Sequence, residues 1–372
     1  MIALRLSKTN GMDRFRTLTV AEIRQETEDC VSVLLGVPDD LREEFRFISG
    51  QYITFKKEIG GEELRRSYSI CTATYENELR VGIKRLPDGR FSSFANEVLK
   101  VGDTLETMPP TGRFLFNADE KKTRHLVGIA GGSGITPVLS IIKDVLNSEP
   151  QSRFTLFYGN RNSASVIFRE QLAALKNRYM DRLSINHVLS DEEVAFDLFH
   201  GMMDSQKVKE LCDRLIDVKT VDSFYICGPE PMIIGARDVL AQAGVSEEKV
   251  HFELFGTAAG PRPEVAGSKE DERGSGPIKS RVSVIMDGDE FEFGLSSNGE
   301  TILEAATNAG IDVPFSCKGA VCCTCLARVK NGEVKMDKNY SLSEKEVEQG
   351  LVLTCQGHPR SARVTVDYDD IW

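Results

Sequence analysis

Five of the nine cysteines in this chain lie between residues 317 and 355, and their spacing is that of a metal centre. Cys317, Cys322 and Cys325 follow the pattern C-x4-C-x2-C, and Cys355 stands thirty residues after Cys325. This is the plant-type ligand spacing of a [2Fe–2S] cluster, which carries one electron at a time. Cys323 falls outside the pattern. Zinc is the main alternative, but paired C-x2-C motifs would favour zinc and this asymmetric spacing does not.

A one-electron centre needs an electron source, and the segment Arg66-Ser67-Tyr68-Ser69 is a candidate for binding one. On a strand, Arg66 and Tyr68 share one face, while Ser67 and Ser69 share the other. Arg66 would supply a cation for the pyrophosphate of a flavin dinucleotide and Tyr68 a flat surface for the flavin ring. Ser69 would hydrogen-bond near the reactive ring nitrogen. Taken alone, these four residues favour an ordinary strand with a surface arginine.

A second segment, Gly89-Arg90-Phe91-Ser92-Ser93, makes a flavin site the better interpretation. It precedes a helix predicted over residues 94–99, so a phosphate could rest on the helix N-terminus. Ser92 and Ser93 would donate further hydrogen bonds. The alternative role for both serines is helix capping.

A glycine-rich turn follows a buried strand predicted over His125–Ala130. Its residues are Gly131, Gly132, Ser133, Gly134, Ile135, Thr136 and Pro137. Apolar residues then recur at helical spacing, with Thr136 as the expected N-cap and Pro137 at the first helical position. Such a turn lets the pyrophosphate of a dinucleotide approach the backbone and the helix N-terminus. The turn lacks the G-x-G-x-x-G fingerprint, so a purely structural need for glycine stays open.

The next predicted strand ends at Tyr158, and Arg161 follows it without an acidic residue before Glu170. An acidic residue here would accept the adenosine ribose hydroxyl, whereas Arg161 could meet a 2′-phosphate, which favours NADPH over NADH. Arg169 is a second candidate, although a solvated surface charge is the better interpretation for it.

A further predicted strand ends at Cys227-Gly228, at the carboxyl edge where a parallel sheet binds its ligand. A lone buried cysteine is more often a small core residue. That packing role is the one expected for the remaining thiols, which are Cys30, Cys71 and Cys212.

These segments must be positioned by three domains joined in series. Short apolar stretches separated by turns predict an antiparallel barrel or sandwich over residues 12–118. Alternating strands and helices predict a parallel sheet over 119–256. A Gly-, Pro- and Ser-rich segment, 257–281, is interpreted as a flexible linker. Over 282–372 we expect hairpins at Asp287-Gly288 and Asn331-Gly332, and a helix from Thr301 to Asn308 that ends at Gly310.

The formal net charge is −11, and residues 282–372 carry 15 acidic and 8 basic residues, giving −7. This charge disfavours nucleic acid as a partner and permits docking to a basic protein surface, although an excess that only aids solubility is an equally good interpretation. No apolar run approaches the roughly 18 residues of a membrane span. The N-terminus lacks the core of a secretory signal. The clustered thiols favour a reducing compartment, so we expect the cytoplasm.

Taken together and in order, these motifs resemble the ferredoxin–NADP reductase superfamily with a C-terminal plant-type ferredoxin domain. The resemblance covers nearly everything after residue 12. The segments Tyr158–Arg161, Ile226–Met232 and Cys317–Cys325 most resemble the reductase subunits of phenylacetyl-CoA 1,2-epoxidases. Reductases of 3-ketosteroid 9α-hydroxylases and other oxygenases share the domain order.

The resemblance implies an FAD-binding β-barrel, an α/β NAD(P) domain and a β-grasp ferredoxin domain. FAD would contact Arg66, Tyr68 and Ser69 on the strand, and Gly89, Ser92 and Ser93 at the following helix. The nicotinamide cofactor would lie on Gly131–Pro137, with Cys227 and Gly228 near its ring. Ser69 and Cys227 would be the catalytic residues. Glu253 and Phe255 match a family segment that returns to the flavin. One departure is Ala320, where plant-type loops usually carry glycine.

The mechanism implied is hydride transfer from NADPH to FAD, followed by single electrons to the cluster and then to an oxygenase component. Two other interpretations stay open. One is a reductase for another acceptor, such as a Rieske steroid hydroxylase or an aromatic-ring dioxygenase. The other is a redox-sensing nucleotide-binding protein without catalytic turnover.

Overall fold

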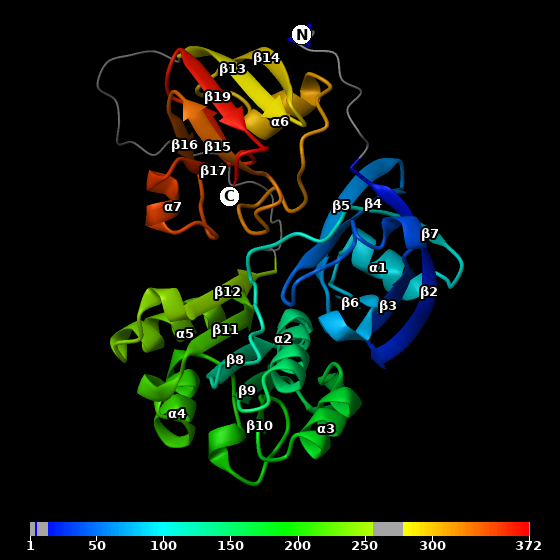
Figure 1. Ribbon diagram of the computed structural model, residues 1–372, viewed down its shortest axis with the longest axis vertical. Coiled ribbons are helices and arrows are strands. Elements are labelled where there is room, and N and C mark those ends of the chain that lie inside the picture. The colour runs from blue at the N-terminus through cyan, green and yellow to red at the C-terminus, as the bar shows by residue number, and fades with distance from the viewer. Residues whose placement is uncertain (1–3, 6–13, 256–277, 372) are drawn as a thin grey trace. The chain divides into compact units, whose positions relative to one another are not determined.

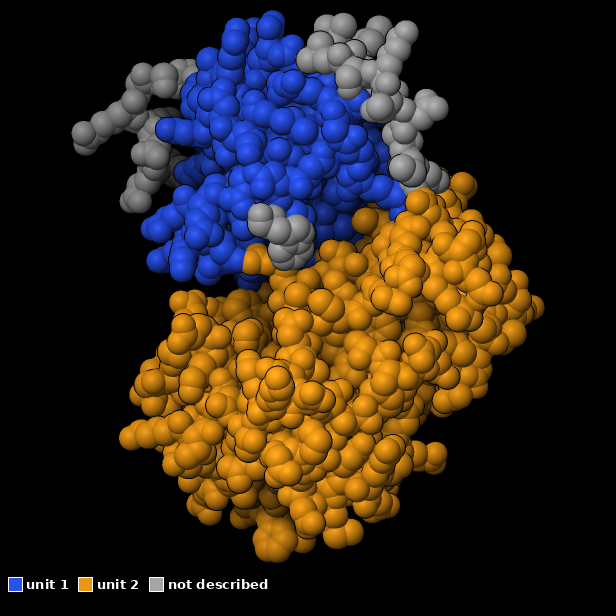
Figure 2. Space-filling view, in the orientation of Figure 1, with its two compact units in different colours: residues 1–14, 256–372 blue, residues 15–255 orange. Residues whose placement is uncertain are grey.

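The computed structural model describes residues 4–5, 14–255 and 278–371, drawn as a ribbon in Figure 1. They divide into two compact units, coloured separately in Figure 2. One unit is Phe15–Phe255, and the other combines Met1–Arg14 with Gly256–Trp372. The first unit holds both the predicted barrel and the predicted parallel sheet.

The barrel is built from six described antiparallel strands in the order β5-β4-β7-β2-β3-β6. An isolated bridge between Ile70 and Val81 links the segment after β5 to β6, so the sheet closes on itself. Alternate side chains fill the interior, which confirms the antiparallel domain. The strands are β2 (Arg16–Thr27), β3 (Cys30–Gly36), β4 (Tyr52–Ile59), β5 (Glu62–Ser69), β6 (Leu79–Lys84) and β7 (Thr104–Thr107).

The helix α1 (Arg90–Glu97) packs its buried residues against the barrel core and begins four residues before its predicted start at Phe94. The earlier start follows from Phe91, which is buried and stacks on Phe55 with 5.8 Å between ring centroids. Winding the chain from Arg90 onward places Phe91 on the inner face of the helix.

The second domain is a five-stranded sheet in the order β10-β9-β8-β11-β12, and every described pair in it is parallel. Successive residues of β8 face opposite sides. Leu126 and Ala130 pack against α2 and α3, whereas Val127 and Ile129 pack against α4 and α5. Its elements are β8 (His125–Gly131), α2 (Ile135–Ser148), β9 (Arg153–Asn160), α3 (Arg169–Arg178), β10 (Leu183–Leu189), α4 (Ser205–Leu215), β11 (Ser223–Gly228), α5 (Glu230–Gln242) and β12 (Val250–Leu254).

The predicted N-cap of α2, Thr136, is wrong by two residues, because the N-cap is Gly134. Gly132 has a positive φ of 52° and opens a 3-10 turn over Gly132–Gly134, so the helix already begins at Ile135. Thr136 is the second helical residue, and its hydroxyl donates to the carbonyl of Ser133 at 3.0 Å. Pro137 is accordingly the third helical residue and still lies within the first turn, where its missing N–H costs nothing.

The two domains of this unit meet through a buried polar contact on α2. Asp144 is 2% exposed and accepts hydrogen bonds from Ser49 and from the Thr74 backbone and hydroxyl, the last at 3.0 Å. Lys143 pairs with Glu76 at 3.0 Å. The partners of both helix residues belong to the barrel domain. The contact therefore fixes the glycine-rich turn, which leads into α2, relative to the barrel.

The other unit is an α+β fold around a mixed sheet in the order β1-β14-β13-β19-β15-β17. β13 pairs in parallel with β19. A capping box between Thr301 and Glu304 starts α6. Arg14 joins this unit through an ion pair with Asp287 at 2.9 Å. Its elements are β1 (Leu4–Arg5), β13 (Lys279–Met286), β14 (Asp289–Ser296), α6 (Ile302–Asn308), β15 (Leu326–Asn331), β16 (Val334–Met336), α7 (Glu344–Glu348), β17 (Leu351–Leu353), β18 (Gly357–Pro359) and β19 (Arg363–Asp367).

The hairpin predicted at Asp287-Gly288 is confirmed, since β13 and β14 pair directly across that turn. The hairpin predicted at Asn331-Gly332 is wrong. The two strands that flank it join different partners, because β15 pairs with β17 and β19 while β16 pairs with β18. Residues 257–277 of the predicted linker lie outside the described residues. The next strand begins at Lys279, within the range predicted as linker.

Candidate functional site

The predicted flavin segment lies on β5 with its side chains divided between the two faces of the strand. Arg66 is exposed and donates to the carbonyl of Arg65 at 2.7 Å. Tyr68 packs its ring 5.6 Å from Phe91. Ser67 and Thr54 hydroxyls are 2.8 Å apart. An exposed cation and an aromatic ring on one strand match what a flavin dinucleotide requires.

The segment at the start of α1 contributes backbone donors more than hydroxyls. Gly89 is the residue before the first helical turn, where N–H groups lack partners within the helix. The Ser92 hydroxyl accepts from Leu86 N at 3.1 Å and donates to the Gly89 carbonyl at 3.0 Å, so it supports the turn that precedes the helix. Ser93 is half-buried, and its own N–H donates to Gly89 at 2.8 Å.

Ser69, from the barrel domain, contacts Glu253, from the parallel-sheet domain. The Ser69 hydroxyl donates to Glu253 Oε2 at 3.0 Å. Burial raises the pKa of Glu253 to about 8, and the hydrogen bond from Ser69 opposes that shift. Cys227 pairs with Glu253 in the register of β11 and β12, which brings all three predicted residues together. A carboxyl group with this pKa is mostly protonated at pH 7.

Cys227 is fully buried, and its thiol is chemically quiet. Burial, together with the nearby Glu253 carboxylate, raises the pKa of Cys227 well above the ordinary value for a thiol. The group therefore stays protonated and shapes the site by packing. The three cysteines predicted to be packing residues are also buried. Burial raises the pKa of Cys71 and Cys212 to about 12, and Cys30 is 1% exposed.

The glycine-rich turn closes directly onto the end of β11. A Cβ atom placed on Gly134 would lie 2.0 Å from the carbonyl oxygen of Cys227. One placed on Gly228 would lie 2.9 Å from the nitrogen of Gly131. The Tyr158 hydroxyl donates to the Gly132 carbonyl at 3.0 Å. The predicted nucleotide residues are thus gathered at the carboxyl end of the parallel sheet, where such sheets bind ligands.

A cation that borders this turn is Lys84, which the sequence did not single out. Arg161 follows β9 and is 66% exposed. Arg169 begins α3 and is exposed. Lys84, at the end of β6, places its ammonium 3.9 Å from the position that a Cβ on Gly132 would occupy. Lys84 lies beside the turn because the two domains pack together, and no local sequence pattern predicts that packing. Phe255, 37% exposed, is the last described residue before the gap.

The four predicted cluster ligands form two pairs. Cys317 and Cys322 lie within hydrogen-bonding distance of each other, and so do Cys325 and Cys355. Cys322 and the backbone N–H groups of Gly319, Val321 and Cys322 lower the pKa of Cys317 to about 6. Within the described residues no three His, Cys, Asp or Glu side chains gather around a single-ion site. Four thiols arranged as two pairs fit a two-iron cluster, with two thiolates for each iron.

The backbone of the cysteine loop is wound so that its N–H groups face the sulfurs. Three residues without the freedom of glycine have positive φ: Lys318 (51°), Ala320 (64°) and Cys323 (56°). The Ala320 N–H donates toward Cys355. The Thr324 hydroxyl donates to the sulfur of Cys322 at 3.1 Å. The left-handed φ of Ala320 gives a physical reason why glycine is usual at this position in similar loops.

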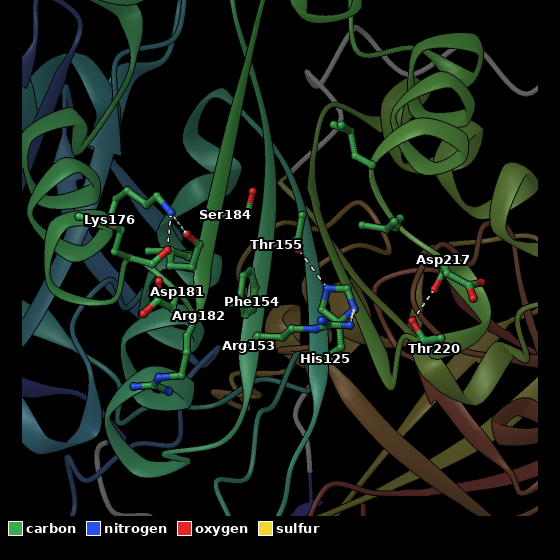
Figure 3. Close-up of a pocket in the computed structure, with 14 residues that line it drawn as sticks. His125, Arg153, Phe154, Thr155, Lys176, Asp181, Arg182, Ser184, Asp217 and Thr220 are labelled. Carbon is green, nitrogen blue, oxygen red and sulfur yellow. Dashed lines mark hydrogen bonds between the residues drawn. The ribbon is translucent and has the colours of Figure 1, made fainter.

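A separate cavity of about 490 Å³ lies at the other end of the parallel sheet (Figure 3). It is bordered by the first residues of β8, β9 and β10, which are His125, Arg153 and Leu183. Arg153 lies 3.3 Å from His125, whose other ring nitrogen is 3.0 Å from the Thr155 hydroxyl. Because parallel sheets bind cofactors at the carboxyl ends of their strands, we assign this cavity no part in the site.

None of the helices that the structure describes is both long and apolar enough to cross a membrane.

Three family profiles match successive parts of the chain. They are described as an oxidoreductase FAD-binding domain over residues 17–116, an oxidoreductase NAD-binding domain over 129–238, and a 2Fe-2S iron-sulfur cluster binding domain over 284–360. Their order is the one that the motifs predict.

Two curated relatives match from end to end. One is a component of the 1,2-phenylacetyl-CoA epoxidase of Escherichia coli (strain K12). It is 40% identical to this chain over 358 residues, which cover 96% of this chain and 99% of that protein. The other is the 3-ketosteroid-9-alpha-monooxygenase, ferredoxin reductase component, of Mycobacterium tuberculosis (strain CDC 1551 / Oshkosh). It is 31% identical over 370 residues, with 96% of this chain and 97% of that protein covered.

The solved structure of phthalate dioxygenase reductase has a similar fold, with a TM-score of 0.58 and 24% identity over 95% of this chain and 98% of that chain. The chain therefore belongs to the family of oxygenase reductases that carry an FAD-binding, an NAD-binding and a 2Fe-2S domain in series, and it is an electron-transfer reductase component of a multicomponent oxygenase.

Proposed function

We propose that this reductase draws electrons from NADPH and delivers them to an oxygenase component of the phenylacetyl-CoA epoxidase type. The observation that carries the proposal is the 40% identity to the epoxidase component over 99% of that protein. A reductase of the 3-ketosteroid monooxygenase type is the second candidate, and the 31% identity over a similar length favours it less strongly. Metal-binding cysteines in place of disulfides suit a reducing compartment such as the cytoplasm.

When bound, the nicotinamide, FAD and the cluster supply hydride transfer and one-electron chemistry, and the protein supplies position and protons. We assign Arg66 and the N-terminus of α1 to the FAD pyrophosphate, and Tyr68 to the flavin ring. Gly131–Pro137 would cradle the pyrophosphate of the nucleotide. Arg161 would meet the 2′-phosphate that distinguishes NADPH from NADH.

Ser69 and Glu253 would handle a proton beside the flavin. The Ser69 hydroxyl, 3.0 Å from Glu253 Oε2, can donate in one direction and accept from a protonated carboxyl group in the other. With a pKa of about 8, Glu253 holds its proton at neutral pH and loses it in mild base. Cys227 would contribute shape to the nicotinamide pocket, because its buried thiol stays neutral.

The cysteine loop would provide the exit for electrons. Cys317 and Cys322 would hold one iron, and Cys325 and Cys355 the other. In the Cys317→Ser variant, NADPH-dependent reduction of cytochrome c should fall to background, while reduction of ferricyanide survives. An equal loss of both activities would show that electrons do not leave through this loop.

The partner is tested by reconstitution. The purified reductase is combined in parallel with a phenylacetyl-CoA epoxidase oxygenase and with a Rieske steroid hydroxylase, each with NADPH or NADH. Product formation only with the epoxidase component, and faster with NADPH, supports the proposal. Turnover confined to the Rieske component would replace the first candidate with the second.

A further inference from the structure

One oxygen of Asp29 faces two cations that come from different domains. Asp29 lies in the turn between β2 and β3, and its Oδ1 accepts from the Thr27 hydroxyl at 2.8 Å. Its Oδ2 lies 3.5 Å from Lys84 Nζ and 3.8 Å from Arg161 Nη2. Lys84 belongs to the barrel domain and Arg161 to the parallel-sheet domain. A single carboxylate therefore balances both cations across the domain boundary.

Lys84 borders the turn that we assign to the nucleotide, and Arg161 reaches the same carboxylate oxygen as Lys84. Lys84 Nζ stands 3.9 Å from the Cβ position of Gly132, and the side chain of Arg161 is 66% exposed. Both distances to Asp29 exceed the 2.7–3.2 Å typical of a hydrogen bond. Asp29 therefore leaves the N–H donors of both cations available for the oxygens of a ligand. Phosphate oxygens are strong acceptors for such charged donors.

We propose that Asp29 is a resident anion, which pairs with both cations in the free protein and competes for them with the phosphate of NADPH. The inference rests on the proposed use of NADPH and names a residue that sets the strength of binding. Once a phosphate lies between the cations, the Asp29 carboxylate stands beside it and repels it. The repulsion is largest for a nucleotide with a 2′-phosphate next to Arg161. Asp29 therefore weakens the binding of NADPH and of the product NADP⁺ more than that of NADH.

The test is a measurement of binding without turnover. Asp29→Asn removes the charge and keeps an oxygen that can accept from Thr27. Calorimetric titration of the FAD- and cluster-loaded protein with NADP⁺ should give a dissociation constant about three- to fivefold lower than that of the wild type, as expected for a weak ion pair. The constant for NAD⁺ should fall by less than about twofold. Glu28→Gln is the matched control, because it removes the same charge from the exposed neighbouring residue.

A double variant tests whether Asp29 acts through Arg161. If Arg161→Gln is introduced first, the selective gain for NADP⁺ from Asp29→Asn should disappear. Weaker NADP⁺ binding in Asp29→Asn, or a change equal to that of Glu28→Gln, would overturn the resident-anion role. So would a gain that persists without Arg161. These results leave the proposed function intact, whereas a wild type that binds NAD⁺ more tightly than NADP⁺ would contradict the nucleotide preference itself.

Discussion

A methyl group at Gly134 has no space, and the substitution Gly134→Ala tests the packing of the glycine-rich turn. The added Cβ would lie 2.0 Å from the carbonyl oxygen of Cys227 and 2.7 Å from the nitrogen of Gly228. Favourable contacts between heavy atoms lie near 3.5–4.0 Å. The end of β11 cannot yield easily, because Cys227 is paired with Ala130 on one side and Glu253 on the other.

The sign of the change in stability distinguishes the steric clash from the effect of glycine on the backbone. Gly134 has a φ of −61°, which alanine adopts readily. Replacing glycine by alanine at such a position ordinarily stabilises a protein by about 0.4–1 kcal/mol. Forcing a methyl group into a filled site costs about 1–3 kcal/mol, and we expect the upper end because the atoms in the way belong to the backbone. The net loss is then about 2–2.6 kcal/mol, and at about 2–4 °C for each kcal/mol it lowers Tm by roughly 4–10 °C.

The assay is thermal unfolding followed by flavin fluorescence, combined with the KM for NADPH in ferricyanide reduction. KM should rise together with the fall in Tm, because the substitution displaces the turn that we propose holds the pyrophosphate. Gly36→Ala is the control, since a Cβ there meets its nearest atom at an ordinary 3.6 Å. A Gly134→Ala protein as stable as the wild type, or more stable, would refute the steric reasoning.

Three further perturbations have defined outcomes. Activity with ferricyanide should fall as pH rises through about 8, where Glu253 loses its proton. Ser69→Ala should shift this fall in kcat/KM to a pH about one unit higher, because the ionised Glu253 carboxylate loses a hydrogen-bond donor. Glu253→Gln should abolish the fall. Thr324→Val removes the hydroxyl donor 3.1 Å from the Cys322 sulfur. It should lower the cluster potential by roughly 30–60 mV in a spectroelectrochemical titration, whereas Thr324→Ser should leave the potential near the wild-type value. Asp144→Ala strands buried donors between the two domains and should cost about 2–3 kcal/mol in urea unfolding; an unchanged midpoint would mean that water replaces the carboxylate.

Local patterns predicted most of the framework. Cys317–Cys325 and Gly131–Pro137 are short segments. In each of them the residue types, the spacing and the neighbouring elements indicate one kind of site, a cluster in the first and a nucleotide in the second. The six barrel strands and the alternating elements of the parallel sheet also follow from apolar periodicity, since one face of each must be buried.

The features that local patterns missed depend on contacts between distant segments. Nothing local distinguishes the turn at Asn331-Gly332 from a hairpin, because the separate pairing of β16 with β18 decides the outcome. Lys84 and Asp29 look like ordinary strand-end charges in the sequence, and only the docking of the domains places them beside Arg161. The family resemblance points to Glu253 as a site residue, but only the register of β12 explains why its side chain faces Ser69.

The neutral thiol of Cys227 should resist oxidation when the enzyme works in the presence of dioxygen. Reduced flavoproteins leak electrons to dioxygen and produce hydrogen peroxide close to their own active site. Peroxide and alkylating reagents attack thiolates far faster than protonated thiols. A cysteine that is 0% exposed and has a strongly raised pKa offers neither access nor a nucleophile. If Cys227 borders the nicotinamide as proposed, the enzyme can keep sulfur there through many cycles without accumulating sulfenic acid.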